Sequence, residues 1–467
     1  MAEPIDAAIF LEDGSAIFQT QYMDDWTEEF PGRFGSITNK MVKPYMEIAA
    51  TDGITMQFKY GHADSVRTDT NPLGDMAAPR MSEGGTLRIR FNRQTPSSND
   101  FTHITAACQF DIYTLENKSK GTIVDFVKDI YDQVMPDYNE KLANLRNSPR
   151  SGALALVNGT AKLNNHRLYA SATGTATNAG GIRVQVDNGS IASFRRNIFV
   201  DFINPSTGAV RAGNIRINRT NTADLSFGAE FVTSGPTGNL STGDLSTVAD
   251  NDIIVYSGTY NKGYYGFASW FGIPSSGESF LGGVDRSTAN YSHMVPTSTR
   301  EGSASARITA AHFDDLAIAM GFLSEDPTLG LAWVTDPTLH TALRRELGED
   351  SFREIPIDDP QMKRFMNFGS VGLNYQHPTF GLVKIMADPL VNPGTLRCIA
   401  TETWKSVFVN HRGLRPVTES GSHWYRMQQA TPNSGKGLIY KADWFGDQTD
   451  FCTQPWKNGQ ILHLSAT

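Results

Sequence analysis

The chain has 467 residues, with 41 Lys and Arg against 49 Asp and Glu, which gives a formal net charge of -8. Hydrophobic residues make up 39% of the chain and charged residues 19%, so it can bury a sizeable core and wholesale disorder is excluded. The acidic balance argues against a protein whose main task is to grip nucleic acid. Three widely spaced cysteines are not a disulfide framework and fit a reducing cytoplasm.

The first part of the chain, residues 1–55, is predicted to be an extended arm. Eight acidic residues and no Lys or Arg precede Arg33, and prolines interrupt the segment. A solvated acidic tail is the alternative interpretation. The segment also carries many apolar and aromatic side chains, Trp26 among them, which favours an arm that needs a partner surface.

Residues 56–118 are predicted to form a long hairpin with an irregular tip. Residues 86–92 alternate, so that Arg88 and Arg90 lie on one face and apolar side chains on the other. Turn-forming residues fill 71–85. Arg93 extends the basic stripe, but three charges without interleaved aromatics are a weak signal for nucleic-acid binding.

The hydrophobic period then changes to that of a helix over residues 121–147. Apolar side chains recur three or four residues apart along one face: Ile123, Val127, Ile130, Val134, Tyr138, Leu142 and Leu145. Pro136 lies inside this segment, where it removes one backbone hydrogen bond and clashes with the preceding turn. We therefore expect a kink at Pro136.

The middle of the chain, residues 175–260, is predicted to be a β-rich module, either a small barrel or a sandwich. Short strands separated by turn clusters are expected over 182–186, 197–203, 214–218, 225–232 and 252–257. Residues 263–306 are loop-like but rich in aromatic side chains, which indicates contact, either internal or with a neighbour.

The last third of the chain is predicted to mix helices and strands. Two helices, over 309–322 and 336–347, flank a buried strand at 329–335, and Asp336 caps the second helix. Strands follow over 380–386 and 395–400, and an aromatic, strand-like segment spans 439–456. No apolar run approaches the ~20 residues that a membrane span needs.

The search for chemical motifs finds no catalytic, cofactor or metal site. The ten histidines are scattered, and His312 and His340 are better explained by packing on their helices. Residues 277–281 begin like a nucleophile elbow but lack its second glycine. The acidic residues between 244 and 252 do not have the spacing of a calcium loop and are better explained as turn caps. The sequence therefore predicts a protein that is not an enzyme.

The order of these parts resembles the major capsid protein of tailed bacteriophages, the Hong Kong ninety-seven phage fold that encapsulin shells share. The local sequences that carry the resemblance are Ser151–Gly159, Ser257–Ser287, Ile308–Leu347, Phe380–Leu390 and Trp444–Cys452. They are packing motifs without chemistry, so their order along the chain identifies the family better than any one of them does. The β-rich stretch exceeds the minimal fold and is expected to be an insertion. No long helical scaffolding segment precedes the hairpin, which implies a separate scaffolding protein or none.

The resemblance implies an α+β fold with six parts. They are an N-terminal arm at 1–55, an extended loop at 56–118, a peripheral domain with a spine helix at 119–165, an inserted β-rich domain at 175–260, an axial domain at 261–375, and a return to the peripheral domain at 376–467.

The function that the resemblance implies is assembly. Hexamers and pentamers of the chain are expected to form an icosahedral virion head in the host cytoplasm, enclosing double-stranded DNA without recognising it and without a membrane. Further copies of the chain are the main partner, and a scaffolding protein, a portal and decoration proteins are the other candidates. We expect the acidic arm, with Trp26, to contact Arg88, Arg90 and Arg93 of a neighbouring loop, and Pro136 to let the spine helix bend between precursor and mature shells.

Two alternatives remain open at the level of sequence. One is a β-rich carbohydrate-binding or hydrolytic phage protein that uses the aromatics of 256–291 as a sugar platform, although the helical stripes count against a pure β architecture. The other is an encapsulin-like shell around cargo enzymes, which shares the fold but usually has a shorter chain without the β insertion.

Overall fold

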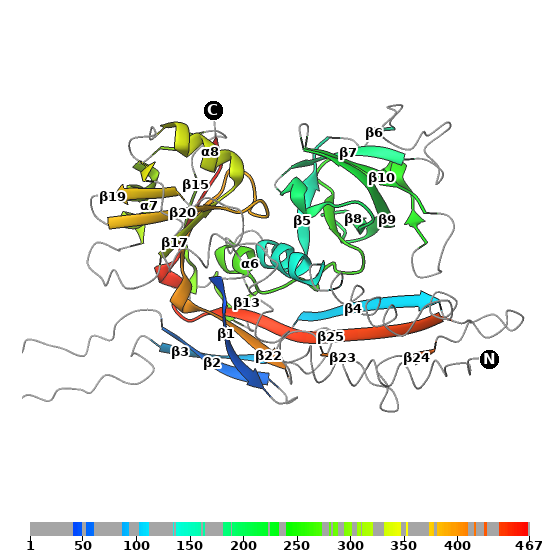
Figure 1. Ribbon diagram of the computed structural model, residues 1–467, viewed down its shortest axis with the longest axis horizontal. Coiled ribbons are helices and arrows are strands. Elements are labelled where there is room, and N and C mark those ends of the chain that lie inside the picture. Colours follow the sequence, from blue (N-terminus) through cyan, green and yellow to red (C-terminus); the bar gives the residue numbers. More distant parts are fainter. Residues whose placement is uncertain are drawn as a thin grey trace, which may run out of the picture.

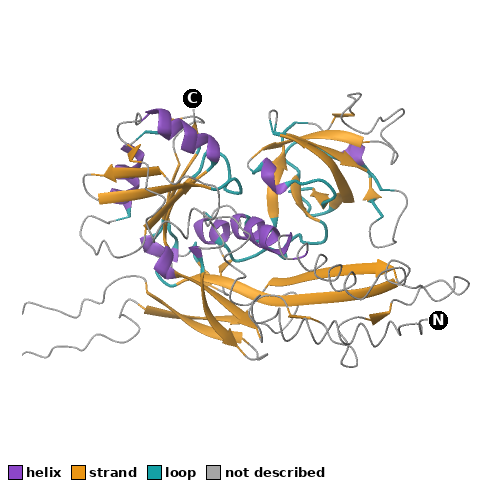
Figure 2. Cartoon of the chain, viewed as in Figure 1, coloured by secondary structure: helices purple, strands orange, loops and turns teal. Residues whose placement is uncertain are grey.

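The computed structural model describes residues 41–48, 53–59, 86–92, 102–111, 134, 137–159, 162–163, 181–187, 189–222, 225–232, 240–272, 280–281, 284–287, 294–300, 306–309, 311–320, 331–346, 352–353, 373–377, 381–409, 415–416, 425–426 and 439–465. These residues form a platform of strands that carries two lobes, a seven-stranded sheet with helices and a closed β-barrel (Figure 1). Helices and strands are mixed along the chain, as predicted (Figure 2).

The platform is a six-stranded sheet organised around one long strand, β25 (Ile439–Cys452). One edge of β25 pairs along its first ten residues with β4 (Thr102–Asp111). Its other edge pairs in turn with β24 (Tyr425–Arg426), β23 (Arg415–Pro416) and β22 (Trp404–Val409), and β1 (Lys43–Ile48) adds in parallel to β22. The sheet therefore combines strands from both ends of the chain.

The predicted hairpin is present as a separate two-stranded sheet. Strand β2 (Gly53–Lys59) pairs antiparallel with β3 (Thr86–Asn92), with Gly53 opposite Asn92 and Lys59 opposite Thr86. The predicted strand at 86–92 is thus confirmed, and the tip that joins the two strands lies outside the described residues.

The β-rich module is a barrel. Six strands pair in the closed cycle β10–β7–β5–β12–β8–β9–β10, and two short strands, β6 and β11, pair at its margin. The strands are β5 (Ala153–Val157), β6 (Lys162–Leu163), β7 (Gly181–Asp187), β8 (Phe199–Ile203), β9 (Val210–Asn221), β10 (Ser226–Glu230), β11 (Thr242–Gly243) and β12 (Ile253–Tyr256). The barrel includes β5, which precedes the expected start of the insertion at residue 175, because β5 pairs with β12 and β7.

The other lobe is a seven-stranded sheet in the order β15–β26–β21–β17–β20–β19–β18. Its strands are β15 (Thr297–Arg300), β26 (Gly459–Leu462), β21 (Leu396–Ala400), β17 (Leu331–Thr335), β20 (Gly381–Ala387), β19 (Leu373–His377) and β18 (Phe352–Arg353). The sheet continues past residue 376, where the return to the peripheral domain is expected. Its strands β20, β21 and β26 all lie beyond that residue.

Two of the predicted helices cover one face of the seven-stranded sheet. α7 (Ala311–Ala319) contacts β26 and β15, and α8 (Pro337–Glu346) contacts β20. Asp336 caps α8 as predicted, since its Oδ1 accepts hydrogen bonds from the backbone N–H groups of Thr338 and Leu339. Apolar side chains of both helices and of the sheet form one buried cluster beneath them.

A central helix over residues 137–147 lies between the platform and the two lobes, beside the short helix α6 (Phe267–Phe271) (Figure 1). This confirms the C-terminal part of the predicted helix at 121–147, and Tyr138, Leu142 and Leu145 of its predicted apolar face are buried. Pro136, where we expect a kink, lies outside the described residues. Residues 137–147 are called the hub helix below.

Two further pairs of short strands complete the described elements. β13 (Phe280–Leu281) pairs with β14 (Val284–Asp285), and β16 (Ala306–Arg307) pairs with β27 (Leu464–Ser465). No helix among the residues that the structure describes has the length and apolar character needed to cross a membrane.

Candidate functional site: a buried polar hub

The hub helix is the point where the platform, the barrel and the seven-stranded sheet meet. Its C-terminal half is buried, including the polar residues Asn144, Arg146 and Asn147. A buried polar side chain without a hydrogen bond lowers the stability of the fold. The hydrogen-bond partners of these residues therefore show which parts of the chain the helix joins.

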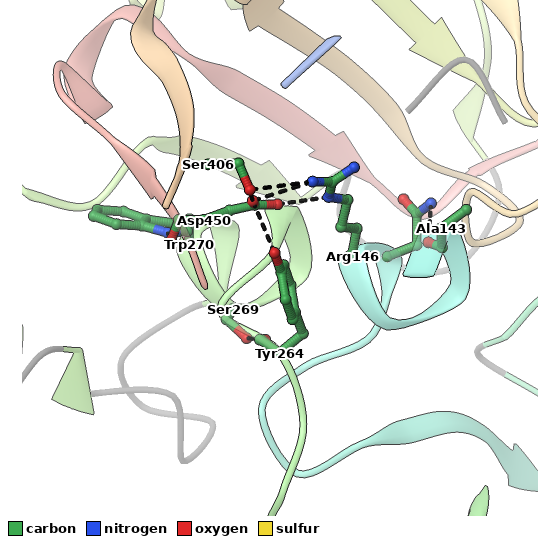
Figure 3. Close-up of polar contacts among 8 residues, drawn as sticks. Ala143, Arg146, Tyr264, Ser269, Trp270, Ser406 and Asp450 are labelled. Atoms are coloured by element: carbon green, nitrogen blue, oxygen red, sulfur yellow. Dashed lines mark hydrogen bonds and ion pairs between the residues drawn. The ribbon is translucent and has the colours of Figure 1, made fainter. Parts of the chain in front are cut away.

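Arg146 joins the hub helix to the platform. Its Nε lies 2.6 Å from Oδ2 of Asp450 in β25, and its Nη2 lies 3.2 Å from Oδ1 of the same carboxylate (Figure 3). The exposed fractions of the two side chains are only 5% and 1%. Burial disfavours the charge on Arg146, but the adjacent carboxylate outweighs that effect and raises the pKa of the guanidinium above its usual value.

Two hydroxyl groups complete the surroundings of Asp450. Ser406, which lies opposite Asp450 on β22, donates to Oδ1 at 2.5 Å, and the Tyr264 hydroxyl donates to the same oxygen at 2.9 Å. The indole N–H of Trp270 in α6 also points to the Asp450 carbonyl, at 3.4 Å (Figure 3). Burial, followed by the nearby Asp450 carboxylate, raises the pKa of Tyr264 well above its usual value, so this phenol stays a donor.

The backbone at Gly266 also lies very close to the backbone of the hub helix at Arg146. A Cβ built on Gly266 would lie 2.4 Å from both Cα and the carbonyl oxygen of Arg146, so only glycine fits at this position. Arg150 follows the hub helix and places its guanidinium 4.0 Å from the centre of the Tyr265 ring. The segment before α6 is therefore fitted against the end of the hub helix.

Asn147 joins the hub helix to the seven-stranded sheet. Its Oδ1 accepts a hydrogen bond of 2.7 Å from Nη1 of Arg397 in β21, and its Nδ2 donates to the Ala143 carbonyl one turn earlier. Burial lowers the pKa of Arg397 to about 10, and the Asp388 carboxylate opposes that change.

The barrel is attached on a third side of the hub helix. Asn144 donates to the Tyr256 hydroxyl of β12 at 2.7 Å and accepts from Ser193 Oγ at 2.9 Å. One turn earlier, Glu140 pairs with Arg195 at 2.6 Å. Glu140 and Asn144 are four residues apart, so they share one face of the helix, and that face meets the barrel.

The barrel and the seven-stranded sheet also touch each other directly. Ser190, just before the 3-10 turn Ile191–Ser193, donates a hydrogen bond to the Pro389 carbonyl. The junction thus ties each module to the hub helix and the two lobes to one another. The Asp450 carboxylate is surrounded by donors and removed from solvent, so the arrangement is suited to holding segments together and leaves no access for a substrate.

The side chains predicted as contact sites are not brought together in the described residues. Trp26, Arg93 and Pro136 lie outside them. Arg88 and Arg90 lie on β3, opposite Gln57 and Thr55 of β2. Their roles as inter-subunit contacts and as a helix kink stay predictions.

Other predicted features have plain structural outcomes. Asp244 caps the 3-10 turn Leu245–Thr247, and Asp252 pairs with Arg211 at 3.0 Å, which agrees with the interpretation of these acids as turn residues. No group of three or more His, Cys, Asp and Glu side chains that can hold a metal occurs among the described residues. His312 is buried, and its Nδ1 lies 3.0 Å from the Thr309 backbone nitrogen.

Sequence reasoning missed the hub. The predicted helix identified the apolar face but gave no role to Asn144, Arg146 and Asn147. The local signal for a buried helix end is that Asn144, Arg146 and Asn147 are interleaved with apolar Leu142 and Leu145, which are both buried. Ser148 and Pro149 follow directly and end the helix. No local pattern pairs Arg146 with Asp450, which lies 304 residues later.

Comparisons with known proteins give similarities in structure alone. No family model matches the chain, and no curated protein matches its sequence. A chain of the cyanophage A-1(L) capsid asymmetric unit has a TM-score of 0.46 and 8% identity, with 92% of this chain and 93% of that chain covered. A chain of the satellite phage P4 procapsid gives 0.36 and 8%, covering 96% and 99%. The capsid of an empty GTA particle gives 0.37 and 7%, covering 92% and 90%. At these identities and TM-scores, the similarities assign no function to this chain.

Proposed function

We propose that this chain is the major capsid protein of a tailed bacteriophage. In this proposal it is a structural protein whose copies assemble as hexamers and pentamers into the icosahedral head that encloses the viral double-stranded DNA. The observation that carries the proposal is the architecture. One platform is built from both ends of the chain, a separate hairpin lies in the sequence between its strands β1 and β4, and a buried helix fixes two lobes to the platform.

The parts of the chain take the following roles in the proposal. The hairpin β2–β3 is the base of the extended loop, the hub helix is the C-terminal part of the spine helix, and the platform is the core of the peripheral domain. The seven-stranded sheet is the axial domain, and the barrel is an insertion. The buried ion pair between Arg146 and Asp450 supports these roles, because it fixes the hub helix to the platform and the modules of a shell subunit must stay together.

The alternative of a sugar-binding platform loses its main support. Six of the seven aromatic side chains between 256 and 271 that suggested it are buried: Tyr256, Tyr264, Tyr265, Phe267, Trp270 and Phe271 are all less than 5% exposed, and Tyr260 is half-buried. For example, the ring centres of Phe267 and of Trp404, which belongs to the platform, are 4.3 Å apart. The six buried side chains form the internal contact that their density predicted, and none of these six can stack on a sugar.

The closed barrel bears on the encapsulin-like alternative. Its strands run from Ala153 to Tyr256 and enclose an apolar core of their own. An inserted module of this size is expected of a larger phage coat protein rather than of a minimal cargo shell. Self-association, with a scaffolding protein, a portal and decoration proteins as further candidates, therefore remains the proposed set of partners.

Electron microscopy tests the proposed function. The full chain is expressed, purified and viewed in negative stain, alone and with co-expressed candidate scaffolding protein. We expect uniform icosahedral particles, because weak contacts between copies are summed around closed symmetry. A monodisperse 51.3 kDa monomer under both conditions contradicts the proposal.

Two finer parts of the proposal have tests of their own. If the acidic arm binds the basic face of the loop, reversal of Arg88, Arg90 and Arg93 to Glu weakens assembly most at low salt, whereas unchanged shell yield across ionic strengths contradicts that contact. If Pro136 lets the spine helix bend, shells of Pro136→Ala are expected to mature incompletely. Normal expansion with an unchanged helix contradicts the second idea.

A further inference from the structure

We infer that the outer face of α7 in one copy of this chain binds the outer face of α8 in another copy. The inference rests on the proposed self-assembly and assigns one of its contacts to two described surfaces. It comes from the charged and apolar side chains that are exposed on the two helices.

The two helices lie on the same face of the seven-stranded sheet but toward different ends of it. α7 contacts β15 and β26 at one end of the strand order, and α8 contacts β20 toward the other. Their inner faces share one buried cluster that includes Phe313, Leu316, Leu339 and Leu343. Their outer faces therefore point away from the sheet and are separate surfaces of one lobe.

The outer face of α7 is acidic and apolar. Asp314, Asp315 and Ile318 are exposed on it. Ile318 is 58% exposed, the largest value among the large apolar side chains that the structure describes as exposed. A lone exposed isoleucine is ordinary, but its position one turn from two carboxylates makes a small patch of mixed character.

The outer face of α8 is basic. Arg344 and Arg345 are exposed in its last turn, and Thr338 and Thr341 are exposed nearer its start. The long stems of the two arginines can cover apolar surface while their guanidinium groups reach carboxylates. This face is therefore complementary to the patch on α7 in charge, and it can cover Ile318 as well.

Symmetry makes such a contact effective although each ion pair is weak. Around a two-fold axis the α7–α8 contact occurs twice in one interface, and in a ring it repeats between all neighbours. The same chain supplies both complementary faces, so no other partner is needed. The second copy is the occupant to which the inference commits.

The helix dipole offers a competing explanation for the charges. Asp314 lies in the first turn of α7, and Arg344 and Arg345 lie in the last turn of α8, where each sign is favourable. This explanation predicts an effect on the stability of a single copy and none on association. It also gives no reason for the exposure of Ile318.

Charge reversal in the full chain separates the two explanations. The acid-reversed variant carries Asp314→Arg and Asp315→Arg, the base-reversed variant carries Arg344→Asp and Arg345→Asp, and the fourfold variant carries all four changes. Association is measured by sedimentation velocity at low and high salt. We expect each double variant alone to associate at least tenfold more weakly at low salt, because like charges then face each other.

The decisive results are the two rescues. An equal mixture of the acid-reversed and base-reversed chains, and the fourfold variant alone, are both expected to recover association. If the charges serve only the helix dipoles, the fourfold variant is the least stable of the three and recovers nothing. Double variants that associate like the wild type, or rescues that fail, overturn the inference.

An apolar substitution provides an independent check with a matched control. Ile318→Ser is expected to weaken association, whereas Val210→Ser, at a barrel residue that is 53% exposed, is expected to leave it unchanged. Equal effects of the two substitutions contradict a specific α7 surface.

The same measurements keep this inference apart from the proposed function. Wild-type chains that associate through α7 and α8 but form no closed shell contradict the proposed function alone. Shells whose yield none of these variants changes contradict this inference alone. A wild type that stays monomeric both alone and with co-expressed scaffolding protein contradicts both.

Discussion

The barrel and the junction around the hub helix are both buried, but they are built from opposite materials. The barrel core consists of apolar side chains from one continuous stretch, from Leu154 to Tyr256. The junction instead depends on charged and amide groups that meet across long sequence separations, with Arg146 and Asp450 304 residues apart. The difference indicates that the barrel specifies itself locally, whereas the junction forms only after distant parts of the chain have come together.

The two regions also offer separate readouts. The chain has seven tryptophans, and none of them lies between residues 153 and 256. Trp270, Trp333, Trp404 and Trp444 are buried in or beside the platform and the seven-stranded sheet. Tryptophan fluorescence therefore follows the junction, and hydrogen exchange in peptides from 153–256 follows the barrel.

The largest expected effect comes from removing the acid at the junction. Asp450→Ala leaves the guanidinium of Arg146 buried without its counter-charge, which we expect to cost about 3–5 kcal/mol. Urea unfolding of the unassembled chain, followed by tryptophan fluorescence, measures this cost. The double variant Arg146→Met with Asp450→Leu is the control and is expected to lose less, because no charge is left unpaired. A cost below ~1 kcal/mol for Asp450→Ala contradicts the role assigned to the pair.

A cavity in the barrel tests its independence. Ile215 is fully buried in the barrel core, and Ile215→Ala is expected to cost about 2–5 kcal/mol. Hydrogen exchange in barrel peptides should accelerate, while the tryptophan transition stays close to that of the wild type. A matching shift of the tryptophan transition shows instead that the two regions unfold as one unit.

Acidification is expected to weaken the seven-stranded sheet through His340. Burial, followed by nearby Arg344, lowers the pKa of His340 in α8 below its usual value of 6.5. The unfolded chain then binds the proton more readily, so the stability held by neutral His340 is present above pH ~6.5 and lost as the pH falls through the lowered folded pKa. His340→Gln should reduce this loss, measured as the urea midpoint against pH.

The barrel provides the control for that measurement. The described barrel residues include no histidine, so exchange in their peptides should not follow this titration. A His340→Gln chain with the full wild-type pH dependence contradicts the assignment.

The smallest expected effect comes from an ion pair on the barrel surface. Arg216 and Glu230 lie 2.8 Å apart, but their side chains are 39% and 29% exposed. Glu230→Gln should therefore cost less than ~1 kcal/mol and less still at high salt. If Glu230→Gln lowers the free energy of unfolding as much as Asp450→Ala does, the expected difference between exposed and buried ion pairs is contradicted.

The same contrast explains what could be predicted from the sequence. The barrel strands and the Asp336 cap were predictable, because alternation and capping are local signals. β5 was missed as a barrel strand because its apolar run directly follows a helix and carries no sign of its partners, β7 and β12. In the seven-stranded sheet, Leu396 of β21 lies opposite Ile461 of β26, and Gly459 of β26 lies opposite Thr297 of β15. No local pattern encodes a register between strands so far apart in the sequence.

The candidate site was less predictable than the fold. The aromatic cluster before residue 272 was expected to make contacts, and it does, against the platform. The Arg146–Asp450 pair depends on the final register of β22 and β25, which places Ser406 opposite Asp450. A buried ion pair of this kind has no sequence spacing to recognise.

Sedimentation velocity of the purified full chain across a range of salt concentrations tests the central claim most directly. The account predicts that wild-type chains form a discrete, very large species, that its amount falls as salt screens the contacts between copies, and that it returns on dilution of the salt. A single species of 51.3 kDa at every salt concentration, for the chain purified alone and for the chain co-expressed with candidate scaffolding protein, contradicts the account.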